Sequence, residues 1–140
     1  MGTLLVALAA CDGDRQVSGP EATMEAQVVN PGVVGDPERG EEYFNQVIDG
    51  FPPCSSCHAV KAGESIEGAP NLHNVAELAE TRMENVTGPA YLYSAIRVPN
   101  GHVVEGYDDV MPDYGNVLTD QQIQDLVAYL LILQDNGPIP

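Results

Sequence analysis

The chain has 140 residues, which suffices for one small domain but not for two. It carries 21 Asp and Glu against 5 Lys and Arg, so its formal net charge is −16. This balance argues against a nucleic-acid-binding protein, because phosphates require a basic surface, and against attraction to anionic lipid headgroups. It suits a partner with a basic docking surface, or equally an acidic surface that only keeps the protein soluble.

The core is expected to be thin, since the chain has no Trp and only 2 Phe, although 44% of its residues are apolar. A small domain of this kind gains from a large apolar group around which it can fold. The 3 cysteines are too few for a disulfide-stapled scaffold.

The sequence begins with an apolar segment. Residues 3–10 are too short to cross a bilayer as a helix, and they run into LAAC at 8–11. This end resembles a bacterial lipobox, in which the peptide is cut before the cysteine and the thiol is joined to diacylglycerol. The resemblance implies an exported lipoprotein anchored through Cys11, although residues 1–3 lack the positive charge that begins a signal peptide. The alternative is an uncleaved apolar N-terminus that packs on a partner.

Three parts are expected along the chain. Residues 1–11 form the signal and lipobox segment. Residues 12–35 show no helical or strand periodicity and scatter Gly, Pro and polar residues, so they are expected to form an extended arm or linker. Residues 36–140 form the folded domain.

The folded domain is expected to begin with a helix. Asp36 can cap it and Pro37 fits its first turn, and the helix should continue through Val47 until Gly50 and the prolines at 52–53 break it. The later elements are expected as a weak helix over 74–80, a helix from Pro89 to about Val98, a loop over 102–117, and a last helix from the capping box at Thr119–Gln122 to about Asp135.

The sequence CSSCH places Cys54, Cys57 and His58 together. A disulfide beside a bystander histidine is one interpretation, and a thioredoxin-type dithiol would need a βαβ setting that is not visible in the sequence. A structural zinc ion needs four ligands, but His73 and His102 do not have the spacing of a zinc-binding pair. Covalent attachment of one c-type haem explains every residue type. Two thioethers on a three-residue step span the vinyl positions of the porphyrin, and His58 is aimed at the iron.

The region from 36 to 135 resembles class I cytochromes c. The CSSCH segment matches the family's haem attachment site, with His58 as the proximal iron ligand. The resemblance implies that the carbonyl of Pro70 in GAPNL accepts the other N–H of this histidine. It also implies that Met111 in VMPDYG is the distal iron ligand.

The same resemblance implies an all-α fold of about four helices around one haem, preceded by the extended N-terminal arm. Gly40 and Phe44 match positions of an N-terminal helix that crosses the C-terminal helix near Tyr129, where a glycine lets two backbones approach closely. Residues 36–140 are then the cytochrome c haem domain.

The sixth iron ligand decides the function. We expect Met111 to be this ligand, with Met24, Met83, His73 and His102 as alternatives. Methionine opposite histidine raises the reduction potential relative to bis-histidine ligation, and a filled coordination shell leaves no site for a substrate. The protein is therefore expected to be an electron carrier and not an enzyme. An open sixth position would instead indicate a small peroxidase or a sensor.

Partners of the haem propionates are less well defined by the sequence. Ordinary packing is the preferred explanation for each of the candidate side chains, which are Tyr91, Tyr93, Arg97, Tyr107 and Tyr114.

The last helix is apolar on two sides. One stripe consists of Ile123, Val127, Leu130 and Leu131, and the other consists of Leu126, Tyr129 and Leu133. A small domain requires only one such stripe against its core. The second stripe is therefore expected to meet the arm or another protein, the alternative being one broad stripe that the domain itself buries.

Two settings for such a carrier follow from the resemblance. One is the mono-haem lipoprotein subunit of alternative complex III, a quinol-oxidising complex, where it would relay electrons from a multihaem cytochrome c subunit to a soluble acceptor. The other is a cytochrome domain that feeds a terminal oxidase. The 140 residues carry no copper-binding domain, which favours the first setting. A free lipid-tethered shuttle is a further alternative, and each places the protein on the outer face of the bacterial cytoplasmic membrane.

Overall fold

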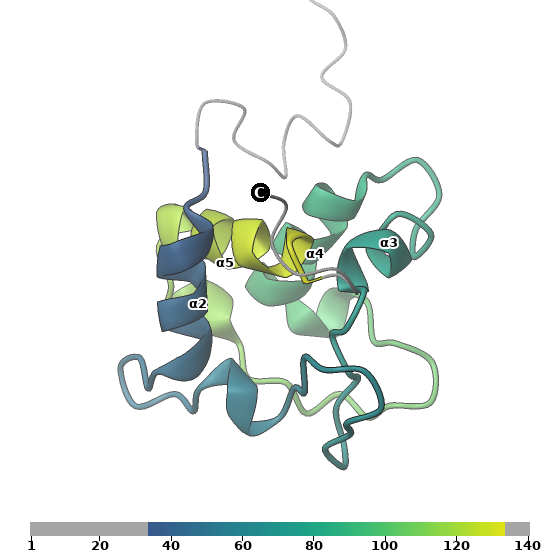
Figure 1. Ribbon diagram of the computed structural model, residues 1–140, viewed down its shortest axis with the longest axis horizontal. Coiled ribbons are helices and arrows are strands. Elements are labelled where there is room, and N and C mark those ends of the chain that lie inside the picture. Colours follow the sequence, from purple (N-terminus) through teal and green to yellow (C-terminus); the bar gives the residue numbers. More distant parts are fainter. Residues whose placement is uncertain (1–33, 134–140) are drawn as a thin grey trace, which may run out of the picture.

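The computed structural model describes residues 34–133, so the expected signal segment and most of the expected arm lie outside it. Four α-helices make up this part of the chain: α2 (Pro37–Asn45), α3 (Val75–Ala79), α4 (Gly88–Arg97) and α5 (Asp120–Leu131). Three short 3₁₀-helices lie between them: η1 (Cys54–Ser56), η2 (Pro99–Gly101) and η3 (Tyr114–Asn116). Within residues 34–133 there are two isolated bridges but no strands, so the expected all-α fold is confirmed (Figure 1).

Helix α2 begins where the sequence predicts and ends earlier. The Asp36 side chain accepts hydrogen bonds from two backbone N–H groups of the first turn, and Pro37 is the first helical residue. The helix ends at Asn45, whereas Val47 lies outside it with 65% of its surface exposed. The prediction that the helix continues through Val47 is therefore wrong.

A tight turn explains this early end. Ile48 and Phe51 exchange two backbone hydrogen bonds of 3.3 and 2.9 Å. Between them, Asp49 has a φ of 49° and Gly50 a φ of 85°. Two positive φ angles in a row are the geometry of a type I′ turn, for which Asp-Gly is a favoured pair. The chain leaves the helix to enter this turn, before it reaches the prolines at 52–53.

Helices α2 and α5 cross closely, as the resemblance implies (Figure 1). A Cβ atom on Gly40 would clash with the carbonyl oxygen of Asp125 and would lie 2.7 Å from the Cβ of Tyr129. One turn further on, the rings of Phe44 and Tyr129 pack with their centroids 5.3 Å apart. The missing side chain at Gly40 therefore permits the crossing, and the aromatic pair fills the space beside it.

A buried carboxylate ties the two helices together. Asp125 on α5 is 1% exposed and accepts hydrogen bonds from the backbone N–H of Asp36 at 2.8 Å and from the Arg39 guanidinium at 3.0 and 3.2 Å. The Gln121 amide adds a hydrogen bond of 2.9 Å. Burial by itself raises the pKa of Asp125, but these hydrogen bonds outweigh it and lower the pKa overall.

Helix α5 begins with the expected capping box, in which Thr119 and Gln122 each bind the other's backbone N–H. The helix ends at Leu131, earlier than expected, and Asp135 lies outside the described residues. Residues from both apolar stripes are buried within the domain: Ile123, Leu126, Val127, Tyr129 and Leu130. The second stripe does not form a spare face, because α2 covers one side of α5 while α3 and α4 contact it elsewhere. The expectation of a partner on this stripe is wrong.

Helices α3 and α4 occupy the positions that the sequence predicts. The Thr87 side chain caps α4 by accepting a hydrogen bond from the N–H of Ala90. Tyr93 and Arg97 both donate to the Asp120 carboxylate, at 2.8 and 2.7 Å, and so join α4 to the start of α5. None of the helices between residues 34 and 133 has the length and apolar character needed to cross a membrane.

Candidate functional site

One cavity of about 460 Å³ collects the residues that the sequence singles out. Its wall contains Cys54, Cys57, His58, Pro70 and Met111, which come from three separate stretches of the chain. Apolar side chains of α3, α4 and α5 line much of the remainder, among them Val75, Leu92, Ile96, Leu126 and Leu130. The volume falls within the range of about 300–1,000 Å³ that is usual for small-molecule and cofactor sites.

A 3₁₀ turn presents the two cysteines and the histidine to this cavity. The backbone N–H groups of Cys57 and His58 both donate to the carbonyl of Cys54, at 3.1 and 2.9 Å. Pro53 precedes the turn in an extended conformation, and its carbonyl accepts a hydrogen bond of 2.7 Å from the Ser56 hydroxyl. These short-range bonds bring the three side chains onto one wall.

The imidazole of His58 is held in one orientation. Its Nδ1 atom lies 2.8 Å from the carbonyl oxygen of Pro70, which is the hydrogen bond that the resemblance implies. A carbonyl oxygen can only accept, so Nδ1 carries the proton. Burial lowers the pKa of His58 below its ordinary value, although the bond to Pro70 opposes this effect. The ring is therefore neutral, with a lone pair on Nε2 that can bind a metal ion.

No disulfide bond joins Cys54 to Cys57. Burial raises the pKa of the Cys54 thiol to about 11, so this thiol keeps its proton at neutral pH. Among residues 34–133, no three His, Cys, Asp or Glu side chains come together around a possible metal position. The arrangement therefore matches neither a disulfide nor a zinc finger, and the same residues include no βαβ unit to support a thioredoxin-type dithiol.

Met111 reaches the cavity from the loop between η2 and η3, where its side chain is partly buried against the core. Tyr114 holds this loop, because its hydroxyl donates to the carbonyl of Pro52 at 2.5 Å and its ring lies 5.4 Å from that of Phe51. The Met111 loop is thereby fastened to the segment that precedes Cys54. Two walls of the cavity are joined in this way.

Most of the alternative iron ligands do not line the cavity. His102 lines it, and its ring meets that of Tyr91 edge-on at a centroid distance of 5.5 Å. His73 and Met83 do not lie on the cavity wall. Met24 lies outside the described residues.

Three of the candidate propionate partners line the cavity: Tyr91, Tyr107 and Tyr114. Tyr93 and Arg97 do not, because both side chains bind Asp120. Sequence reasoning missed Arg82, which lines the cavity from the segment between α3 and α4. The scarcity of basic residues, 5 in the whole chain, narrows the candidates for a positive charge in the cavity but does not distinguish Arg82 from the others.

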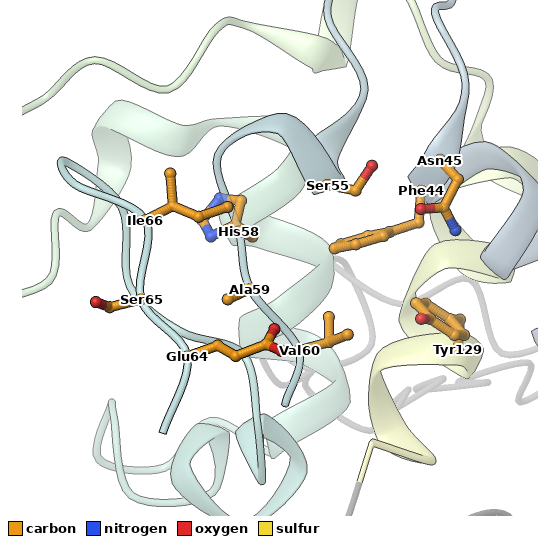
Figure 2. Close-up of a pocket in the computed structure, with 10 residues that line it drawn as sticks. All are labelled: Phe44, Asn45, Ser55, His58, Ala59, Val60, Glu64, Ser65, Ile66 and Tyr129. Carbon is orange, nitrogen blue, oxygen red and sulfur yellow. The ribbon is translucent and has the colours of Figure 1, made fainter. Parts of the chain in front are cut away.

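A second recess of about 440 Å³ lies beside His58 (Figure 2). The rings of Phe44 and Tyr129 form one side of it, and residues of the loop over 58–66 form the other. Neither cysteine lines this recess, and Met111 does not line it either. The potential iron ligands do not meet there, so the larger cavity is the candidate site.

The larger cavity suits a c-type haem, since it offers apolar walls for the macrocycle, two thiols for its vinyl groups and a neutral imidazole for its iron. The fold is that of a class I cytochrome c domain. A family model described as "Cytochrome C oxidase, cbb3-type, subunit III" matches residues 35–130, and the chain belongs to this family. A comparison with curated proteins finds no match. The domain binds covalent haem c and acts as a haem-based electron-transfer protein.

Proposed function

We propose that Cys54 and Cys57 hold the single haem through thioether bonds, and that His58 and Met111 bind its iron. The main support is that all four residues line the same apolar cavity. The haem supplies a one-electron Fe(III)/Fe(II) couple. With His58 and the Met111 thioether as its protein ligands, the iron would have no open position for a substrate and would only transfer electrons.

The surrounding residues have distinct tasks in this proposal. The carbonyl of Pro70 keeps His58 in the tautomer that binds metal and makes its imidazole more basic. Tyr114 fastens the Met111 loop to the attachment segment. The apolar wall limits access of water to the haem, and both water access and thioether ligation are factors that set the reduction potential.

We further propose that the domain is the mono-haem subunit of a membrane quinol-oxidising complex of the alternative complex III type. This rests on the resemblance of GHVVEGYDDVMP at 101–112 and of the capped apolar helix that follows it. Cys11 would carry a lipid anchor, and residues 12–35 would connect it to the domain on the outer face of the bacterial cytoplasmic membrane. The donor would be a multihaem cytochrome c and the acceptor a soluble protein.

A second candidate is a cytochrome subunit that delivers electrons to a terminal oxidase. The family model that matches residues 35–130 is described as an oxidase subunit, which favours this possibility. The two candidates share the site chemistry and differ in the partners that surround the domain.

Purification of the full-length chain in mild detergent, followed by identification of the subunits that accompany it, separates the candidates. A multihaem cytochrome c with quinol-oxidising subunits supports the first candidate, and oxidase subunits support the second. Recovery of the chain alone contradicts both and indicates a free shuttle. A Cys11→Ala variant is the control for the anchor, because it should release the domain from the membrane and leave the haem spectrum unchanged.

A further inference from the structure

The cavity wall carries a single positive charge among the residues that the structure describes. Four Lys and Arg residues lie between positions 34 and 133. Arg39 is bound to Asp125, Arg97 is bound to Asp120, and Lys61 is exposed and not on the wall. Arg82 is the remaining one, and it lines the cavity.

The Arg82 side chain is partly buried, yet among residues 34–133 it has no ion pair or hydrogen-bonded partner. A guanidinium has five N–H donors in a planar fork and stays charged at all physiological pH values. Partly burying such a group without an acceptor is unfavourable, and pairing it with a carboxylate offsets the cost. The position of Arg82 therefore indicates that the cofactor bound in the cavity carries an anionic group next to this side chain.

Two further polar side chains lie at the same corner of the cavity. Tyr91 and His102 both line the wall, and their rings are in edge-to-face contact at 5.5 Å. Burial raises the pKa of Tyr91, and the positive charge of Arg82 acts in the opposite direction, which places Arg82 close to the phenol. Arg82, Tyr91 and His102 thus form one polar corner of the wall.

The haem that this family binds has two propionates, which are the charged groups on an apolar macrocycle. The carboxylates on the wall, Glu67, Asp108 and Asp109, repel them, as does the net charge of −16 of the whole chain. The propionates therefore need a positively charged group, and Arg82 is the candidate on the wall.

We propose that Arg82 binds a haem propionate, with Tyr91 and His102 beside it, and that this corner sets which edge of the haem points toward the segment between α3 and α4. This inference rests on the proposed function of the cavity. It assigns Arg82 in place of Arg97, and it gives His102 a role near the propionates instead of at the iron.

The test is a spectroelectrochemical titration of the haem-loaded protein. A positive charge near the haem favours Fe(II) over Fe(III), so Arg82→Gln should lower the midpoint potential. Arg82→Lys should keep most of the wild-type value, because the charge remains. Arg97→Gln is the matched control, since it removes the same charge from a residue that is already paired outside the cavity. Its shift should be clearly smaller.

The propionate bending bands in resonance Raman spectra give a second readout. They should move in Arg82→Gln and Arg82→Lys, because lysine does not reproduce the planar fork, and they should stay in place in Arg97→Gln. Unchanged bands in both Arg82 variants, or equal shifts of potential in Arg82→Gln and Arg97→Gln, would overturn the inference. If Arg82→Gln fails to incorporate haem, the bands of Arg82→Lys decide. If the wild-type protein carried no covalent haem, the proposed function itself would be wrong. This outcome is distinct from the failure of the Arg82 inference, which is judged on haem-loaded protein.

Discussion

The Nδ1 atom of His58 lies 2.8 Å from the backbone carbonyl oxygen of Pro70. This contact joins the attachment turn to a loop whose shape is fixed by its own hydrogen bonds. The Asn71 amide donates to the carbonyls of Lys61 and Glu64 at 2.9 and 2.6 Å. The carbonyl that orients the imidazole is thus held by the residue next to it.

Replacing Asn71 should weaken the hydrogen bond between His58 and the Pro70 carbonyl indirectly, through the loop that carries Pro70. We expect Asn71→Ala to cost about 2–3 kcal/mol of unfolding free energy, the net contribution of three hydrogen bonds, since the Asn71 side-chain oxygen also accepts one from the backbone N–H of His73. A weaker bond from Nδ1 makes the imidazole a poorer donor to iron, so the midpoint potential should rise. Denaturant titration and voltammetry measure the two effects. Asn45→Ala is the control, because it removes a similar amide–carbonyl bond on α2 and should leave the potential unchanged.

Each of the two cysteines should be able to attach the haem without the other. Cys54→Ala and Cys57→Ala should each retain haem through one thioether, with the α-band of the reduced protein displaced to longer wavelength by the remaining vinyl group. The double variant should lose all covalently bound haem. Haem staining of denaturing gels and the pyridine haemochrome spectrum test this. Covalent haem in the double variant would place the attachment elsewhere.

Tyr114 should stabilise the Met111 loop through its hydroxyl. We expect Tyr114→Phe to lower the free energy of unfolding by about 1 kcal/mol, the net contribution of one hydrogen bond, because the carbonyl of Pro52 loses its donor. The iron–methionine bond should then break at a lower denaturant concentration than in the wild type, as followed by the far-red absorption of the oxidised protein. Tyr43→Phe removes a hydroxyl from α2, far from this loop in the chain, and is the control. Equal midpoints for both variants would refute the role of Tyr114.

The crossing of α2 and α5 should not tolerate a side chain at Gly40. Because its Cβ would meet the backbone of Asp125, we expect Gly40→Ala to destabilise the fold by about 1–3 kcal/mol, as overpacking does. Glu41→Ala, on the exposed side of the same helix, should change stability by less than about 0.5 kcal/mol. Thermal or denaturant unfolding of the two variants provides the comparison.

Asp125 should make the stability of the domain depend on pH. Its pKa is lower in the folded chain than in the unfolded chain, so its contribution is present above about pH 4 and is lost as the pH falls through the folded value. Asp125→Asn should lower the free energy of unfolding by about 2 kcal/mol near neutral pH. It should also make that free energy fall less steeply as the pH is lowered. Asp120→Asn, whose ion pair with Arg97 is exposed, should cost less than about 1 kcal/mol. A pH profile unchanged by Asp125→Asn would contradict this account.

The sequence predicts well those features that depend on neighbouring residues. The cap at Asp36 and the capping box at Thr119 depend on local hydrogen bonds, and both are present. The predicted end of α2 is wrong because the Asp49-Gly50 turn competes with helix continuation, and Asp-Gly is itself a turn signal in the sequence.

Features that depend on distant contacts were harder to predict. Burial of both stripes of α5 follows from how the other helices pack around it, which the stripes alone do not encode. In the same way, nothing local distinguishes Arg82, on the cavity wall, from Arg97, bound to Asp120 across two helices. The sequence singles out Cys54, Cys57 and His58 because their spacing and neighbours carry chemistry, whereas the residue proposed to bind a propionate depends on tertiary position.

The iron–methionine charge-transfer band of the oxidised protein tests the central claim most directly, because it reports sulfur bound to iron. We expect this far-red band in the wild type and its complete loss in Met111→Ala, with a lower midpoint potential. Absence of the band in the wild type, or its persistence in Met111→Ala, would contradict a carrier closed by His58 and Met111.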